Sequence, residues 1–440
     1  MSSAKVEHVP GAEFIGQEIY DLISELYPIC RSITGDGVRV SLGLLKKHIP
    51  LTLHEVPSGT EVFDWTVPKE WNIRDAYLKN AQGDKVVDFQ KCNLHVVSYS
   101  VPVNKKVSLG ELKQHLFTLP ECPDWIPYRT SYYKENWGFC LSHKQFLDLR
   151  DEEYEVCIDA SLENGRLTYG EYYLPGEKSD EVLISCHICH PSLANDNLSG
   201  IALATFLAKL MESQARRYSY RFLFIPGTIG SITWLSRNEA NVARIKHGLV
   251  LACVGDAGKL TYKKSRQGNA EIDTAVAHVL KHSGADYEII EFSPYGYDER
   301  QFCSPGFNLS VGCFMRSPHG RFPEYHTSAD NLDFVGPAYL ADSLSKCLSV
   351  VDMLESNRAY INQYPKCEPQ LGRRGLYQMI GGGTEQRVYE LAMLWVLNQS
   401  DGEHTLLDIA EKSQLEFSVI KTAADKLLEC DLLKEVRAIA

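Results

Sequence analysis

The chain has 440 residues, of which 44% are hydrophobic, 10% aromatic and 23% charged. This composition is typical of a folded protein with two or three domains, and it excludes a disordered or low-complexity chain. With 45 basic and 57 acidic residues, the formal net charge is −12. That balance argues against a general binder of nucleic acid or of anionic membranes, because both need concentrated positive charge.

The sequence also predicts a cytoplasmic protein that does not enter a membrane. No apolar run approaches the roughly 18–20 residues that a spanning helix needs, and the first residues lack the charged and apolar regions of a secretory signal. The 13 cysteines show no regular spacing of the kind a disulfide framework has. We therefore interpret most of them as buried small side chains in a reducing compartment.

Taken in chain order, the first sixty residues predict two helices. Apolar residues recur at helical spacing over residues 11–31, and a second such pattern covers residues 40–49. Between residues 61 and 154 the pattern changes to short β-like runs separated by Pro, Gly and Asn. We predict that this stretch is a β-rich domain inserted into a larger unit.

From residue 181 onward, apolar strand-like runs alternate with helical segments. Such alternation is typical of α/β domains with a largely parallel sheet flanked by helices. A stretch with Pro, Gly and few apolar residues then predicts a linker, and the helical segments and short apolar tail after it outline a winged helix. The predicted parts are an α/β core (1–60 and 155–362), the insert (61–154), the linker (363–383) and the C-terminal domain (384–440).

The charge of the last sixty residues bears on the role of this C-terminal domain. From Gly381 to Ala440 there are eleven acidic and six basic residues, a net charge of −5. The expected recognition helix carries Lys421 and Lys426 but no arginine for guanine contacts. We therefore expect no nucleic-acid partner and predict a protein–protein or homo-oligomer element. A DNA-reading regulator and a simple packing appendage are the alternatives.

Three polar motifs, far apart in the chain, carry the candidate chemistry. The run SCHICHPSLANDNLSG places two histidines at the end of a strand and Asp196 in the loop that follows. His326 lies in the polar loop EYHTSADNLDFV, and Asp298 and Glu299 are adjacent in GYDERQF. Ligands of open α/β sheets bind at the carboxyl ends of strands. Imidazole and carboxylate side chains together suit zinc, so we predict a metal site.

These motifs resemble those of a known family. The runs HICHPSLANDNLSGIA and YHTSADNLDF are similar to motifs of the zinc aminopeptidases related to glutamate carboxypeptidase. Over nearly the whole chain, strings such as RSITGDGVR, PYGYDERQF and LWVLNQSDG resemble bacterial aminopeptidase-like proteins associated with polysaccharide biosynthesis. The resemblance implies an aminopeptidase-like core with a β-rich insert and a C-terminal winged helix. It matches His187, Asp196 and His326 to metal ligands.

Several carboxylates of the zinc aminopeptidases have no match here. Cys189 stands where an aspartate orients the first histidine ligand. Gly227 and Thr228 stand where the general base and another ligand are expected. Ala252 stands near a further ligand position, for which Asp256 is a candidate substitute. The three ligands that remain imply a mononuclear site that binds one zinc ion per chain and keeps an open position.

The resemblance implies a zinc-dependent, aminopeptidase-like amide hydrolase in which water attacks the amide carbonyl of a small-molecule or peptide substrate. Glu299 or Asp298 would supply the general base. For Glu299 the alternative is an ordinary carboxylate paired with Arg300. We predict His190 as a fourth ligand, a partner of a ligand or a transition-state donor. The competing function is an altered member that binds or converts a modified amino acid or a sugar-linked substrate in polysaccharide or secondary-metabolite biosynthesis.

The β-rich insert is predicted to shape the substrate entrance, because aromatic and polar side chains suit a concave ligand wall. The alternative is that its aromatic side chains form the core of the insert itself. The aromatic residues in question are Trp65, Trp71, Tyr132, Tyr133 and Trp137.

Overall fold

A computed structural model describes residues 12–132, 134–376 and 384–436 of the protein. Tyr133, residues 377–383 of the predicted linker and the last four residues of the predicted tail lie outside the described part. The chain divides into two units. The first unit comprises residues 1–270 and 285–345, and the second comprises residues 271–284 and 346–440.

An eight-stranded sheet forms the centre of the first unit, with the strand order β1-β10-β12-β11-β13-β16-β14-β15. Strands β12, β11, β13 and β16 run parallel to one another, whereas β1 and β10 are antiparallel at one edge and β14 is antiparallel to β16. The predicted, mostly parallel α/β sheet is therefore confirmed. Its strands are β1 (Thr52–Pro57), β10 (Arg166–Leu174), β11 (Glu181–His187), β12 (Ser219–Ile225), β13 (Ile245–Leu251), β14 (Leu260–Lys263), β15 (Tyr287–Ile290) and β16 (Val311–Met315).

Strand β11 lies at the middle of this sheet, and its position explains its sequence. All seven of its residues are buried, since it pairs with β12 on one side and β13 on the other. A strand covered on both faces has a nearly continuous apolar sequence, as EVLISCH does. Its carboxyl end is His187, so the first polar motif begins where the strand leaves the sheet.

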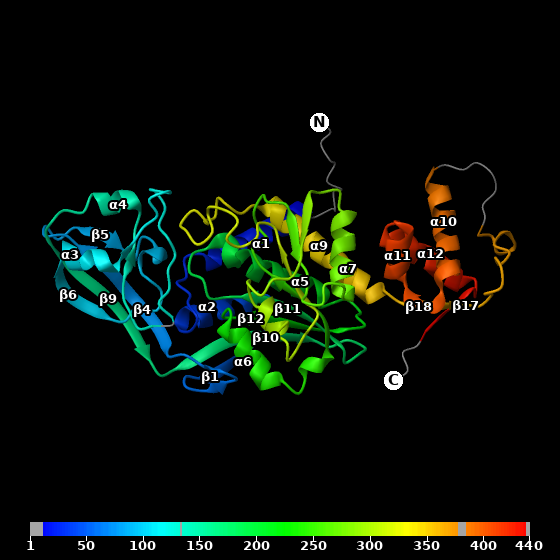
Figure 1. Cartoon of the computed structure of the whole chain (residues 1–440), viewed down its shortest axis with the longest axis horizontal. Helices are drawn as coiled ribbons and strands as arrows, with labels where there is room; N and C mark the ends of the chain where they lie inside the picture. Colours follow the sequence, from blue (N-terminus) through cyan, green and yellow to red (C-terminus); the bar gives the residue numbers. More distant parts are fainter. Residues whose placement is uncertain (1–11, 133, 377–383, 437–440) are drawn as a thin grey trace. The chain divides into compact units, whose positions relative to one another are not determined.

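Helices pack on this sheet, and several of them begin directly after its polar loops. Helix α5 contacts α1 and the strands β11, β12 and β13, and Figure 1 shows it in green beside the central strands. Gly200, its first residue, is required because a β-carbon there would lie 2.4 Å from the carbonyl oxygen of Leu251. Outside the insert, the α-helices of this unit are α1 (Ala12–Leu26), α2 (Asp36–Leu45), α5 (Gly200–Met211), α6 (Ile229–Asn238), α8 (Glu299–Phe302) and α9 (Pro337–Ser356), whose last residues belong to the second unit.

The insert is built on a four-stranded antiparallel sheet with the order β5-β4-β9-β6. Strand β9 stays in this sheet to Glu163, so the insert's sheet continues past residue 154 before β10 enters the central sheet. The strands of this sheet are β4 (Glu70–Lys79), β5 (Lys85–Asp88), β6 (Val103–Ser108) and β9 (Glu153–Glu163). Around it lie the smaller elements β2 (Glu61–Val62), β3 (Trp65–Thr66), α3 (Leu109–Leu112), β7 (Leu116–Phe117), β8 (Phe139–Cys140) and α4 (His143–Leu147).

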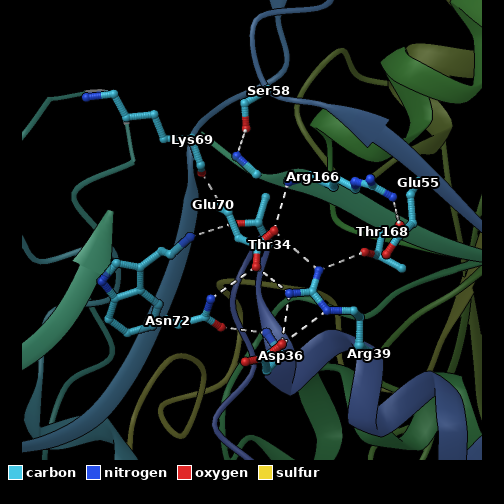
Figure 2. A network of polar contacts seen from close by, with 12 residues as sticks. Thr34, Asp36, Arg39, Glu55, Ser58, Lys69, Glu70, Asn72, Arg166 and Thr168 are labelled. Atoms are coloured by element: carbon cyan, nitrogen blue, oxygen red, sulfur yellow. Dashed lines mark hydrogen bonds and ion pairs between the residues drawn. The ribbon is translucent and has the colours of Figure 1, made fainter. Parts of the chain in front are cut away.

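A polar network joins the insert to the core (Figure 2). Glu70, the first residue of β4, accepts hydrogen bonds from Arg39 of α2, from the backbone N–H of Arg166 in β10 and from Asn72. Asn72 in turn accepts a hydrogen bond from the backbone N–H of Asp36, 2.6 Å away. The Glu70 side chain is 12% exposed, so water screens these interactions only partly. One carboxylate therefore holds the start of the insert against two elements of the core.

The second unit contains the predicted winged helix together with α7 (Glu271–Lys281), the last residues of α9 and β17 (Ala359–Asn362), all of which the sequence analysis had placed in the α/β core. Strand β17 lies between β18 and β19 in a three-stranded sheet. No helix in the described residues is long and apolar enough to cross a membrane. The other elements of this unit are α10 (Thr384–Gln399), β18 (Asp401–Thr405), α11 (Leu406–Ser413), α12 (Phe417–Glu429) and β19 (Leu433–Glu435).

Candidate metal centre

The three residues matched to metal ligands lie together at the carboxyl end of the central sheet. His187 ends β11, Asp196 lies in the loop before α5, and His326 lies in the loop between β16 and α9. Nε2 of His187 is 2.8 Å from Oδ1 of Asp196, and Nε2 of His326 is 3.0 Å from Oδ2 of the same carboxylate. Each oxygen of Asp196 therefore faces one imidazole.

His190 is the fourth member of this cluster. Its ring lies 5.0 Å from that of His187 and 5.1 Å from that of His326, measured between ring centroids. Ligand atoms of His187, His190 and Asp196 all lie within 4.8 Å of one another, so these three side chains could hold one ion. The sequence left the role of His190 open, and the structure places it among the candidate ligands.

The donor atoms of the cluster fit a zinc ion. Oδ2 of Asp196 and Nε2 of His326 are buried and complete no hydrogen bond, although they lie 3.0 Å apart. Burial lowers the pKa of His190 to about 3, which keeps its imidazole neutral at pH 7. Burial alone would raise the pKa of Asp196, but the surrounding imidazoles hold it well below its usual value. Neutral imidazoles and an ionised carboxylate are the forms that bind zinc.

Buried polar residues fix the loop that carries Asp196. The carboxylate of Asp330 accepts the backbone N–H groups of Asn195 and Asp196, at 2.6 and 2.9 Å. Asp256, the candidate substitute ligand, accepts a hydrogen bond from the Asn195 side chain at 2.7 Å and another from Ser317. These contacts make Asp256 a support of the loop, because both of its oxygens already accept hydrogen bonds.

Tyr297 contacts the centre, although the sequence did not single it out. Its hydroxyl donates to Oδ1 of Asp196 at 3.0 Å, and its ring stacks on His187 with 4.5 Å between centroids. Burial raises the pKa of this phenol well above its usual value, so the hydroxyl keeps its proton. The one signal for Tyr297 in the sequence is its place directly before Asp298 in GYDERQF.

Asp298 lies beside Gly227, the position at which the resemblance implies a general base or metal ligand. A β-carbon on residue 227 would lie 3.0 Å from Cβ of His187 and 3.5 Å from Oδ2 of Asp298. Oδ1 of Asp298 accepts a hydrogen bond from Ser231 at 2.7 Å, and Oδ2 is buried without a partner. Burial raises the pKa of Asp298 to about 6. The carboxylate thus lies on the side of His187 where Gly227 replaces the expected acid.

Glu299 points to a different partner. It is fully buried, and its Oε1 lies 2.9 Å from Nζ of Lys263, which also donates to the carbonyl oxygen of Tyr295 at 2.7 Å. The backbone passes so close to this pair that a β-carbon on Gly296 would lie 2.0 Å from Oε1 of Glu299. Glu299 therefore pairs with a lysine rather than with a histidine of the cluster.

Cys189 stands where the resemblance implies an aspartate that orients the first histidine, and a thiol does not have the chemistry of a carboxylate. Its sulfur lies 3.5 Å from Nδ1 of His190 and 3.7 Å from the carbonyl oxygen of Gly227. Burial raises the pKa of Cys189 to about 12, so the group is a neutral thiol at pH 7. A neutral thiol is a weak hydrogen-bond partner and not an activated nucleophile.

One residue of the insert, which the sequence analysis did not name, lies beside the centre; that the insert shapes a substrate entrance stays a prediction. The ring of Tyr128 lies 5.1 Å from those of His190 and His326. Trp71 and Trp137 are buried in the insert, where Trp71 donates to the carbonyl of Ser100. These two tryptophans therefore belong to the insert's own core, the alternative considered for them.

Comparison with known proteins identifies the family. The model of the family described as "Domain of unknown function (DUF4910)" matches residues 20–357, more than half of the chain. The chain belongs to this family. A winged helix-turn-helix model matches residues 358–435, so the DUF4910 core is followed directly by the winged helix of the second unit.

Relatives of this DUF4910 protein give it an aminopeptidase-like fold. A Clostridium acetobutylicum protein named for polysaccharide biosynthesis and an aminopeptidase-like domain is 58% identical, over 98% of this chain and 99% of its own. A crystal structure from Clostridium acetobutylicum, described provisionally as a peptidase, is 58% identical with a TM-score of 0.93 and covers 97% of this chain and 98% of its own. BSAP, a zinc aminopeptidase from Bacillus subtilis, has a TM-score of 0.56 at 14% identity, over 77% of this chain and 94% of its own. That identity shows a shared fold alone.

Proposed function

We propose that the protein is a zinc-dependent amide hydrolase of aminopeptidase type with one metal ion per chain. His187, Asp196 and His326 would hold the ion, and His190 is placed to be a fourth ligand. The observation that carries this proposal is the buried Asp196 carboxylate with an imidazole nitrogen within 3.0 Å of each oxygen. A bound zinc ion would polarise the substrate carbonyl and lower the pKa of water at the site.

Asp298 is the general base that the geometry favours. A general base works best when its pKa lies near the working pH, and burial raises that of Asp298 to about 6. Its Oδ2 has no hydrogen-bond partner, so it is free to accept a proton from the attacking water and to pass it to the leaving amine. Ser231 holds the other oxygen and fixes the orientation of the carboxylate.

Glu299, the other candidate base, is better explained as an anchor. Its ion pair with Lys263 is buried, and Lys263 holds the carbonyl oxygen of Tyr295, two residues before Tyr297. Replacing Glu299 by glutamine would leave a buried lysine without a counter-charge, which would impair the site through its structure. A Lys263→Met/Glu299→Met double variant separates the roles, because it removes both charges and any base together.

A second candidate function keeps the fold and changes the substrate. The protein would act on, or bind, a modified amino acid or a sugar-linked amide in polysaccharide biosynthesis. The missing carboxylates at Gly227 and Thr228 support an altered chemistry, and the name of the Clostridium acetobutylicum relative supports the biosynthetic setting.

The test is turnover of the zinc-loaded protein on a panel of aminoacyl, peptide and sugar-linked amides. We expect Asp298→Asn to keep the metal and to lose turnover by about 100-fold or more, the usual contribution of a general base. The Lys263→Met/Glu299→Met variant should retain most of the activity. Activity that survives in Asp298→Asn and is lost in the double variant would transfer the base role to Glu299.

A further inference from the structure

A short segment of the insert runs beside the loop that carries His326. The backbone N–H of Tyr128 donates to the carbonyl oxygen of His326 at 2.7 Å, and that of Ser328 donates to the carbonyl oxygen of Ile126 at 2.8 Å. The hydroxyl of Ser328 also accepts the N–H of Ile126 at 2.9 Å. Residues 126–128 and 326–328 therefore pair as two short antiparallel strands, centred on Pro127 and Thr327.

The loop of His326 needs such support. His326 has a φ of 56°, in the left-handed region that side chains other than glycine rarely adopt. A residue in this region is strained, and the strained conformation persists when its surroundings hold it. The pairing with residues 126–128 holds the backbone of His326 at the residue itself, through its carbonyl oxygen.

The residues that directly follow this segment are tied to the rest of the first unit. Ser98 donates its backbone N–H to the carbonyl of Arg129 and accepts the N–H of Ser131, both at 2.9 Å. The hydroxyl of Ser98 lies 2.6 Å from that of Ser32, in the link between α1 and α2. The segment is thus held between the insert and the core rather than lying free over the site.

The side chain of Tyr128 extends this support to the imidazoles. Its half-buried ring meets the ring of His326 at 89° and that of His190 at 60°, each with 5.1 Å between centroids. The side chain of His326 is 32% exposed, and the Tyr128 ring is one of its aromatic contacts. Removal of the ring would take away one aromatic contact of each imidazole.

We propose that the insert completes the metal centre: Tyr128, together with the backbone of residues 126–128, is a positioning element for His326 and His190. The insert is therefore needed for metal binding as well as for the shape of the site. This inference rests on the proposed function, since it assumes that these imidazoles bind zinc. Outer partners of metal ligands change metal affinity by about 10–100-fold when they are removed.

The test measures zinc affinity of the full chain by competition with a chromogenic chelator, and ligand geometry by the visible absorption of the cobalt(II)-substituted protein. Tyr128→Leu fills the space without a ring, and Ser328→Ala removes the acceptor for Ile126. We expect Tyr128→Leu to weaken zinc binding by about 10-fold or more and to change the cobalt spectrum. Ser328→Ala should weaken binding in the same direction, and Tyr128→Phe, which keeps the ring, should restore wild-type values.

Tyr77→Ala is the matched control, because it removes a tyrosine ring from β4 of the insert, where its hydroxyl bonds to Glu155. Equal zinc affinity and an unchanged cobalt spectrum in Tyr128→Leu and Ser328→Ala would overturn the inference and leave the proposed function intact. Weakening by Tyr77→Ala to the same extent would also overturn it, because the effect would then follow from general loss of stability. Failure of the wild-type chain to bind zinc would overturn the proposed function and this inference with it.

Discussion

Asp298→Asn should make the metal-free protein more stable at neutral and alkaline pH. Asp298 is fully buried, and burial raises its pKa from 3.8 to about 6. The folded protein therefore binds the proton of this carboxyl more tightly than the unfolded chain does. Below pH 3.8 the raised pKa does not change the free energy of unfolding. This free energy falls as the pH rises from 3.8 to about 6, and it stays reduced at higher pH.

The size of the effect follows from the shift. About two pKa units correspond to about 3 kcal/mol of destabilisation once the group is ionised. At pH 5 about half of this cost is already present, so about 1.4 kcal/mol is added between pH 5 and pH 8. Asparagine cannot ionise and avoids this cost, although its buried N–H₂ group adds a penalty of about 1–3 kcal/mol that does not depend on pH.

The assay is denaturant unfolding of chelator-treated protein at pH 5 and pH 8, with the free energies of unfolding extrapolated to water. We expect the difference between Asp298→Asn and wild type to shift by about 1.4 kcal/mol in favour of the variant from pH 5 to pH 8. Asp64→Asn, at an exposed position of the insert, is the control substitution. The same difference at both pH values would refute the reasoning that Asp298 is a strained, buried carboxyl.

Three further predictions concern other parts of the chain. Glu70→Ala should lower the free energy of unfolding by about 2–3 kcal/mol in denaturant titration, because it removes the hydrogen-bond acceptor of Arg39 and of the Arg166 N–H. Glu70→Gln is the comparison variant, and equal losses of unfolding free energy in the two variants would contradict the prediction. The second unit should lose stability as the pH falls below about 6.5, because Nε2 of His278 accepts the N–H of Phe417 at 3.0 Å and can do so only while the imidazole is neutral. Burial lowers the pKa of His278, as do His282 and Lys281, against the opposing effect of Glu411. Thermal unfolding of this unit at pH 5 and pH 8 measures that loss, which His278→Gln should abolish. The full chain should not bind duplex DNA at physiological salt in a fluorescence anisotropy titration, since both lysines of α12 are paired with acids, whereas micromolar, salt-sensitive binding would show the opposite.

The central sheet could be predicted from the sequence because its strands are buried on both faces. The apolar run of β11 and the helical pattern of α5 are local signals, and they place His187 and Asp196 on either side of one loop. The end of the insert was less well defined. Strands β9 and β10 are joined by two residues and belong to different sheets, and nothing in their alternating sequences marks that change.

The candidate site could be predicted only where its residues lie in motifs. Asp298 and Glu299 are neighbours in one motif, and the sequence could not tell which of them faces His187. The orientation of the two side chains depends on Lys263, which lies 36 residues before Glu299 and forms an ion pair with it. Tyr128 was not predicted because it belongs to the insert and meets His326 only through the pairing of two distant loops.

The metal content of the full-length protein tests the central claim most directly. We predict about one zinc ion per chain in the wild type by elemental analysis after gel filtration, and almost none in His326→Ala, which removes a direct ligand. The Lys263→Met/Glu299→Met double variant should retain the ion, since these two side chains pair with each other and not with the histidines of the cluster. Two tightly held ions per chain would contradict the mononuclear site. Wild type and His326→Ala that both lack zinc would show that this aminopeptidase-like fold works without a metal.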